Sequence, residues 1–110
     1  MTNPLSQSAD PDTIEFDAFA DAVDAGGVAV VDVREPHEFA AGHIPEAVNL
    51  PLSRFDAEEL PSGKPVILIC QAGGRSRNAL NRARASGRED IRHYAGGMNG
   101  WRMRGGDVTV

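Results

Sequence analysis

Four consecutive apolar residues, Val66 to Ile69, constrain the fold of this 110-residue chain more than any other stretch. They are mostly β-branched, and such a run is typical of a strand that is buried on both faces of a parallel sheet. The run ends at Cys70, and Gln71 to Gly74 follow as a short turn whose glycines permit positive φ and close approach of a ligand. Ser76 is a good N-cap for a helix over residues 77–86, which contain no proline or glycine. The predicted order is strand, cysteine, tight loop and helix N-terminus.

The position of Cys70 before a helix N-terminus has a chemical consequence. A loop that curls over such a terminus aims several backbone N–H groups at one point, where the helix dipole adds partial positive charge. A thiol held there has a lowered pKa, and Arg75 and Arg77 add positive charge close by. The same loop would hold a persulfide or a small oxyanion. The alternative is that Cys70 is a small apolar residue at the end of a core strand, but the Gly-Gly turn and the Arg-rich helix favour a reactive site.

Length, composition and cysteine content predict one globular domain without a disulfide or a metal. The chain has 41% hydrophobic and 25% charged residues, as ordinary single domains do. One cysteine excludes an internal disulfide and a resolving cysteine within the chain. The histidines have no zinc-type spacing with the cysteine, and we interpret each as a turn or surface residue: His37, His43 and His93.

The N-terminus and the hydropathy pattern predict a cytoplasmic protein that does not bind membranes. No apolar stretch approaches the ~20 residues of a membrane span. Residues 1–11 are polar and lack the basic start and apolar core of a signal peptide.

Charge is distributed unevenly along the chain. Residues 1–60 carry 13 acidic and two basic residues, whereas residues 61–110 carry three acidic and nine basic residues. No aromatic interleaving or binding motif accompanies the arginines that follow Cys70, so we expect no nucleic-acid partner. We interpret them partly as a solvated helix face and partly as a local positive field around the loop.

Strands and helices are expected to alternate along the chain. We expect a flexible tail over residues 1–12, which are rich in Ser, Asp, Asn and Pro, and one folded domain over residues 13–110. The expected strands are residues 13–16, 28–33, 47–50, 66–69 and 91–94. The expected helices are residues 17–24, 35–41, 53–60 and 77–86 and a short one that carries Trp101, a core anchor. This alternation predicts an α/β fold with an open, mostly parallel five-stranded sheet and helices on both faces.

Asp32 is the one charge in the apolar context of residues 28–33, and it stands near the carboxyl end of that expected strand. Ligands gather at the carboxyl ends of strands in open parallel sheets. The Asp32 carboxylate could therefore receive loop N–H groups or pair with Arg75. It could equally cap the next turn, and the sequence leaves both interpretations open.

Residues Cys70 to Ser76 also carry a family resemblance. Their sequence, Cys-Gln-Ala-Gly-Gly-Arg-Ser, resembles the active-site loop of rhodanese-like domains, Cys-x-x-Gly-x-Arg-Ser. Three other stretches match in the same order: Val30 to Glu35 resembles the family's central strand, Gly42 to Pro51 its first signature and Tyr94 to Trp101 its C-terminal signature. Together the resemblance covers about Thr13 to Val108. Four weak motifs in register form strong evidence.

Three residues depart from the family pattern. Glu46 stands where the first signature usually has glycine, so the turn before Ala47 is expected to differ. Arg88 follows Gly87 where an aromatic residue is common. Gln71 replaces a frequent arginine, which lowers the positive charge of the loop and leaves open whether it prefers a dianion such as thiosulfate.

The resemblance implies a sulfurtransferase that needs no metal or organic cofactor. Cys70 would be the nucleophile that takes sulfane sulfur from a donor as a persulfide, and cyanide, a small thiol or a partner protein's cysteine would accept it. Loop N–H groups would stabilise the anionic sulfur, and Arg75 would bind the donor's anion or brace the loop against Asp32 or Glu38. We expect a monomer. The expected substrate-binding residues are Gln71, Ala72, Gly73, Gly74, Arg75 and Ser76, and the supporting residues are Asp32, Arg34 and Glu38.

Two other functions are considered. Cysteine phosphatases and arsenate reductases, some of which share this fold, place their arginine after five intervening residues, whereas four residues separate Cys70 from Arg75. The loop is one residue too short for a phosphate, which argues against this class. The second alternative is a sulfur carrier or partner-binding module with little small-molecule turnover, and the sequence leaves it open.

Overall fold

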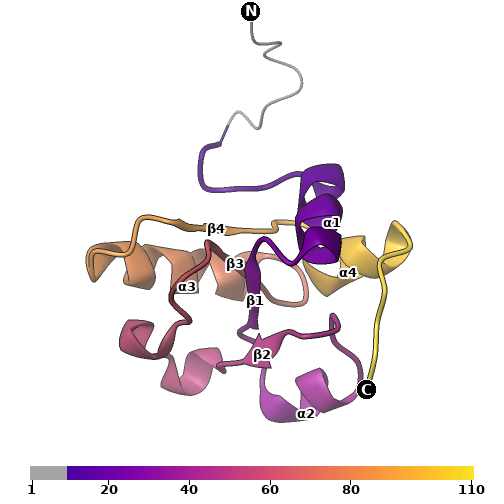
Figure 1. Cartoon of the computed structure of the whole chain (residues 1–110). Helices are drawn as coiled ribbons and strands as arrows, with labels where there is room; N and C mark the ends of the chain where they lie inside the picture. The colour runs from indigo at the N-terminus through magenta and orange to yellow at the C-terminus, as the bar shows by residue number, and fades with distance from the viewer. Residues whose placement is uncertain (1–9) are drawn as a thin grey trace, which may run out of the picture.

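The computed structural model of the chain describes residues 10–110, in which strands and helices alternate (Figure 1). Residues 1–9 of the expected tail lie outside the described residues. The elements in chain order are α1 (Phe16–Ala25), β1 (Ala29–Asp32), α2 (Pro36–Ala40), β2 (Val48–Asn49), the short 3-10 helices η2 (Leu52–Arg54) and η3 (Ala57–Glu59), β3 (Val66–Ile69), α3 (Gly74–Ala85), β4 (Ile91–His93) and α4 (Gly97–Met103).

The sheet has four strands in the order β2-β1-β3-β4, and every neighbouring pair is parallel. From β1 the chain passes to β2 on one side and then crosses to β3 on the other side of β1. Their carboxyl ends therefore open at a switch point between β1 and β3, where open α/β sheets bind ligands. Asp32 ends β1 and Cys70 directly follows β3, so this topology brings the two residues to the same edge.

The expected fold class is correct, but the expected number of strands is wrong, because residues 13–16 do not form a strand. Thr13 makes only an isolated parallel bridge to His93, and the Ile14 amide donates to the His93 carbonyl at 3.2 Å. The chain then turns at once into α1, whose N-cap is Glu15, so only two residues remain for pairing.

Both faces of the sheet are covered, and each face has its own core. Figure 1 shows α3 and the 3-10 segments on one side of the sheet and α1 and α4 on the other. Along β3, Val66, Leu68 and Cys70 pack with α3, whereas Ile67 and Ile69 pack with α1 and α4. This alternation explains why the whole run is apolar, as expected of a strand buried on both faces.

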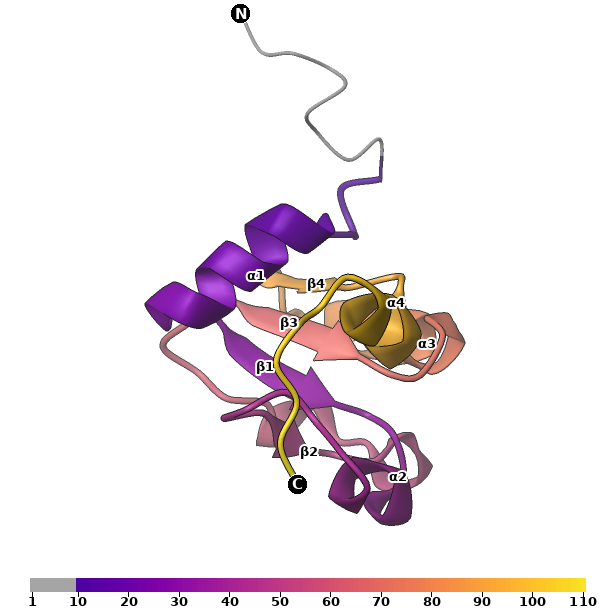
Figure 2. The same ribbon diagram turned by 90° about the vertical axis from the view of Figure 1, so that its right-hand side faces the viewer.

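The α1 and α4 helices cover the same face of the sheet (Figure 2), and an aromatic cluster joins them to Tyr94, the residue after β4. The Phe19 ring lies 5.0 Å from the Trp101 ring and 5.2 Å from the Tyr94 ring, centroid to centroid. Trp101 is 3% exposed, and its Nε1 donates to the Asp107 carbonyl at 2.8 Å. The interpretation of Trp101 as a core anchor is confirmed.

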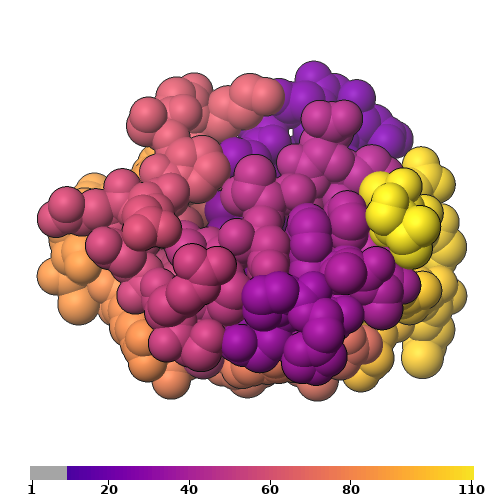
Figure 3. Space-filling view, turned by 90° about the horizontal axis from the view of Figure 1, so that it is seen from below, coloured from indigo at the N-terminus to yellow at the C-terminus, as the bar shows by residue number. Residues whose placement is uncertain are grey.

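The edge of the sheet at β2 is short and partly exposed. Val48 is 47% exposed, and Figure 3 shows this face with the C-terminal residues, in yellow, beside it. The C-terminal segment is held there because His43 and Thr109 form an antiparallel bridge with two hydrogen bonds of 2.8 Å each. The expected helix over residues 53–60 is replaced by η2 and η3.

The α3 helix begins earlier than the sequence predicts, and Ser76 is not its N-cap. The cap is Gly73, with φ of +106°, a left-handed conformation that favours glycine. A Cβ at Gly73 would lie 2.4 Å from the Ala95 carbonyl oxygen, so a side chain has no room there. Ser76 therefore sits inside the first turn of α3, where its amide reaches back to Cys70.

The strained turn at Glu46 supplies a stability prediction. Glu46 has φ of +71°, a conformation that costs a non-glycine residue about 1–2 kcal/mol. Glycine removes this strain but loses about 0.5–1 kcal/mol more chain entropy on folding. We expect Glu46→Gly to raise the free energy of unfolding by about 0.5–1 kcal/mol, measured by urea denaturation. Glu46→Ala is the matched control because it removes the carboxylate and keeps the strain. If the glycine variant is no more stable than the alanine variant, the left-handed backbone at Glu46 does not destabilise the fold.

Candidate active site

Cys70 lies at the carboxyl end of β3, and the loop that follows folds over its sulfur. The Gly73 amide donates to Cys70 Sγ at 3.0 Å and the Ser76 amide at 3.3 Å. The Ser76 hydroxyl lies 3.5 Å from Sγ, within hydrogen-bond distance for sulfur. Cys70 is only 1% exposed. The sulfur is thus held by donors from both the loop and the first turn of α3.

These donors decide the acidity of the thiol. Burial by itself raises the pKa of Cys70, because the interior disfavours the charged form. Hydrogen bonds from the Ser76 hydroxyl and from the backbone of Ser76, Gly73 and Ala72 act in the opposite direction and prevail. The net result is a Cys70 pKa below the ordinary thiol value, which raises the fraction of thiolate at a given pH.

The α4 helix fixes the orientation of the loop. The Met98 amide donates to the Cys70 carbonyl at 2.8 Å, and the Asn99 amide donates to the Gln71 carbonyl at 3.1 Å. The first backbone carbonyls of the loop therefore face the N-terminus of α4. The later amides, those of Gly73 and Ser76, face the sulfur. Gly97 allows this contact, since a Cβ there would lie 2.3 Å from the Gln71 carbonyl oxygen.

Asp32 pairs with Arg34, and the expectation that it pairs with Arg75 is wrong. Arg34 Nη2 lies 2.7 Å from Asp32 Oδ2, and Asp32 and Arg34 are 0% and 3% exposed. The Arg34 amide also donates to Asp32 Oδ1 at 3.0 Å, so the alternative, a carboxylate that caps the next turn, describes its position. Both Asp32 carboxylate oxygens accept hydrogen bonds from Arg34, its neighbour two residues along the chain.

Arg34 connects this buried pair to the loop. Its Nη1 donates to Gln71 Oε1 at 3.2 Å, and its Nη2 donates to the Gly42 carbonyl at 2.8 Å. The side-chain Nε2 of Gln71 in turn donates to Asn99 Oδ1 at 2.6 Å. The neutral Gln71 side chain thus accepts from Arg34 and donates to Asn99.

Arg75 is paired with Glu38 across the loop. Its Nη1 and Nη2 donate to the two Glu38 carboxylate oxygens at 2.7 and 3.0 Å. Of the two acids expected to brace the loop through Arg75, Glu38 therefore does so. Gly74, the residue before Arg75, is exposed and begins α3.

His93 is the residue that sequence reasoning missed, since it was interpreted as a turn or surface residue. It is 2% exposed, and its Nδ1 lies 2.8 Å from Ser76 Oγ. Burial and the charge of Arg77 lower the pKa of His93. The alternation of a strand could have indicated this burial, because His93 lies two residues after the apolar Ile91 and therefore on the same face of β4.

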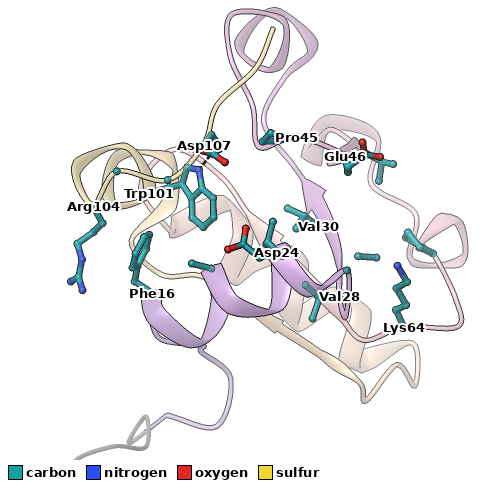
Figure 4. Close-up of a pocket in the computed structure, with 18 of the residues that line it drawn as sticks. Phe16, Asp24, Val28, Val30, Pro45, Glu46, Lys64, Trp101, Arg104 and Asp107 are labelled. Atoms are coloured by element: carbon teal, nitrogen blue, oxygen red, sulfur yellow. Dashed lines mark hydrogen bonds between the residues drawn. The ribbon is translucent and has the colours of Figure 1, made fainter.

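A hollow lined by residues of α1, β1 and the C-terminal segment is separate from this site. It has a volume of about 820 Å³, and its lining includes Phe16, Asp24, Val28, Lys64 and Trp101 (Figure 4). None of the described residues that line it belongs to the loop after Cys70. The candidate site is at Cys70, because the hydrogen-bond donors converge on its sulfur and not on this hollow.

Within residues 10–110, no group of three His, Cys, Asp or Glu side chains has a geometry that could hold a metal ion. No helix in the same range is long and apolar enough to cross a membrane.

The comparisons agree with this geometry. The chain belongs to the rhodanese-like domain family, which it matches over residues 15–104. It is 34% identical over 122 residues to the thiosulfate:glutathione sulfurtransferase of Saccharomyces cerevisiae, covering 93% of this chain and 88% of that protein. An uncharacterized protein of Synechocystis sp. is 48% identical over 80 residues, 71% of this chain, and the chain spans only 45% of that relative's length. A rhodanese-related protein from Thermoplasma volcanium superposes with a TM-score of 0.72 at 32% identity, covering 82% of this chain and 92% of that one.

The donors around Cys70 predict an acidic thiol. We expect the rate of alkylation by iodoacetamide to rise with a midpoint below the ordinary thiol pKa of about 8.5. Because the chain has one cysteine, the intact mass reports this reaction directly. The same protein unfolded in urea is the control, and its midpoint should return to the ordinary value. An equal midpoint in folded and unfolded protein would mean that the loop does not stabilise the thiolate.

The Glu38–Arg75 pair predicts a stabilisation that acid removes. Hydrogen bonds from Arg75 lower the pKa of Glu38 from an ordinary 4.5 to about 2. Because the folded pKa is the lower one, the contribution is complete above pH 4.5 and disappears as the pH falls towards 2. Both side chains are partly exposed, so we expect less than about 1 kcal/mol.

The measurement is urea denaturation of wild type and Glu38→Gln across this pH range. The difference in unfolding free energy should be present at neutral pH and shrink on acidification. The same substitution in an Arg75→Met background is the control, and its trend should be smaller, because only the Glu35 amide and the charge of Arg34 still lower the pKa of Glu38 there. A difference that stays constant down to the lowest pH would contradict the ion pair.

Proposed function

We propose that this protein is a sulfurtransferase that carries sulfane sulfur as a persulfide on Cys70. The observation that carries the proposal is the pair of backbone amides, from Gly73 and Ser76, that donate to Cys70 Sγ at 3.0 and 3.3 Å. Both residues lie within the range that matches the rhodanese-like domain family. Donors fixed in this way stabilise negative charge on sulfur, as an oxyanion hole does on oxygen.

In the first half-reaction the Cys70 thiolate attacks the sulfane sulfur of a donor such as thiosulfate. A new S–S bond forms at Cys70, and the S–S bond of the donor breaks. The electron pair of the broken bond leaves with sulfite, so Cys70 becomes a persulfide anion and no proton is consumed. The amides of Gly74 and Arg75 lie in the first turn of α3, where helix N–H groups have no intrahelical carbonyl, and they are available to the new terminal sulfur.

In the second half-reaction a nucleophile attacks the terminal sulfur of the persulfide. Cyanide or a thiolate forms a bond to that sulfur, and the S–S bond to Cys70 breaks. Its electron pair returns to Cys70 and restores the thiolate. Because the chain contains one cysteine, a thiol acceptor must come from another molecule, either a small thiol or a cysteine of a partner protein.

The loop geometry also argues against phosphate chemistry. A phosphate-binding loop needs an arginine free to clamp the phosphoryl oxygens, whereas both terminal nitrogens of Arg75 donate to Glu38. The neutral Gln71 lowers the positive charge at the loop further. We therefore propose that a persulfide donor is used more readily than the thiosulfate dianion. A carrier protein would form the persulfide but turn over small donors slowly.

The decisive test is the intact mass of the protein after incubation with a sulfane donor. Incubation with thiosulfate or a polysulfide should add the mass of one sulfur atom, and cyanide should then remove it. The Cys70→Ser variant is the control and should gain nothing.

Two outcomes would overturn the assignment. One is wild-type protein that gains no sulfur from any sulfane donor. The other is an adduct that persists in Cys70→Ser. Repeated turnover with cyanide as acceptor separates an enzyme from a carrier, because a carrier forms the adduct without releasing thiocyanate at a comparable rate.

A further inference from the structure

A continuous polar contact links the reactive sulfur to a buried imidazole on the neighbouring strand. Ser76 Oγ lies 3.5 Å from Cys70 Sγ and 2.8 Å from His93 Nδ1. Ser76 is 0% exposed and His93 is 2% exposed, so water does not replace either partner. The contact joins the end of β3, the first turn of α3 and the end of β4. The mechanism described above does not use His93.

The Ser76 hydroxyl has one hydrogen and three possible acceptors. Besides Cys70 and His93, the Gly73 carbonyl oxygen lies 3.1 Å from Ser76 Oγ. That carbonyl already accepts the Arg77 amide at 3.1 Å, so it does not depend on the hydroxyl. A negatively charged sulfur attracts the hydrogen more strongly than a neutral carbonyl, because charge-assisted hydrogen bonds are roughly twice as strong. Whether the hydroxyl hydrogen of Ser76 points to the sulfur therefore depends on whether His93 Nδ1 also accepts it.

The tautomer of His93 follows from its second nitrogen. Nε2 is buried and has no hydrogen-bond partner among the described residues. A hydrogen on Nε2 would be an orphaned donor, and Nδ1 would then take the single hydrogen of Ser76 away from the sulfur. A hydrogen on Nδ1 instead donates to Ser76 Oγ and leaves Nε2 as a bare lone pair, which is the less costly defect in a buried site.

The surroundings of His93 favour the neutral ring. Arg77 on α3 opposes a positive imidazole, and Asp10, which pairs with Arg77, partly offsets it. The segment that covers the strand contributes backbone contacts, with the His93 amide donating to the Asp12 carbonyl at 2.9 Å. Near the sulfur the facing cation is Arg75, which is paired with Glu38. Burial acts in the same direction as Arg77.

We propose that His93 is a positioning residue for the Cys70 sulfur. The neutral imidazole, with its hydrogen on Nδ1, donates to Ser76 Oγ and so directs the hydroxyl hydrogen onto the sulfur anion. The imidazole takes no proton from Cys70 and touches no substrate. The extension from thiolate to persulfide rests on the proposed function, whereas the effect on the thiolate does not require sulfur transfer.

The test is a double-mutant cycle on the pH dependence of Cys70 alkylation, with Ser76→Ala and His93→Leu. We expect His93→Leu to raise the alkylation midpoint by about 0.5 pH units, because the unpolarised hydroxyl is free to turn to Gly73. His93→Asn keeps an N–H donor near the Nδ1 position and should restore most of the shift. In the Ser76→Ala background, His93→Leu should cause no further change, because its effect passes through the hydroxyl.

Exposed His37 supplies the matched control, and His37→Leu should leave the midpoint unchanged. Three results would overturn the proposal: an unchanged midpoint in His93→Leu, no recovery in folded His93→Asn, or an equal shift in the presence and absence of Ser76. The alkylation needs no sulfur donor. If wild type fails to transfer sulfur but the double-mutant cycle gives the expected shifts, the result counts against the proposed function and not against the role of His93.

A second measurement uses the wild-type protein and is independent of how the variants fold. The ¹⁵N chemical shifts of the imidazole rings report which nitrogen carries the hydrogen. At a pH where Cys70 is the thiolate, His93 should be neutral with its hydrogen on Nδ1. A hydrogen on Nε2 alone would overturn the proposal, and an imidazolium would show instead that His93 had accepted the thiol proton.

Discussion

The donation of backbone N–H groups to Cys70 Sγ is the interaction on which the rest of the site depends. It exists because two helix N-termini meet at one loop. The α4 terminus takes the carbonyls of Cys70 and Gln71, and the α3 terminus then presents the amides of the following residues to the sulfur. Neither arrangement tolerates a side chain at Gly73 or Gly97, where a Cβ would meet backbone atoms at 2.4 and 2.3 Å. The two glycines thus define the shape of the anion site.

The buried Asp32–Arg34 pair positions this loop relative to the rest of the sheet. Buried ion pairs contribute little net stability, since the cost of removing both charges from water offsets their attraction. Their value here is geometric, because Arg34 also holds Gln71 and the Gly42 carbonyl. One guanidinium therefore fixes the end of β1, the turn after α2 and the start of the cysteine loop. In this chain the neutral Gln71 side chain accepts from Arg34, so the loop is tied to the buried ion pair without a further charge.

Local sequence signals predicted the strand at Val66–Ile69, the loop and the α/β class, because these features depend on short-range patterns. The predictions for Ser76 and His93 were wrong because of long-range contacts, whereas the one for Asp32 missed a partner only two residues away. Ser76 looked like an N-cap, but the tight packing of Gly73 against Ala95 begins the helix three residues earlier. Asp32 could reach several partners in principle, and only the fold shows that its neighbour Arg34 occupies it. His93 was misassigned because its partner, Ser76, lies 17 residues away on another element.

The central claim is that the amides at the start of α3 hold the anionic sulfur on Cys70. Backbone ¹H and ¹⁵N chemical shifts, compared before and after conversion of Cys70 to the persulfide, test it most directly. The largest changes should fall on the amides of residues 73–76, because these N–H groups face the charged sulfur. Cyanide should reverse these changes. Protein that gains the sulfur by mass but leaves those amides unmoved would contradict the claim, since the persulfide would then be held by other groups.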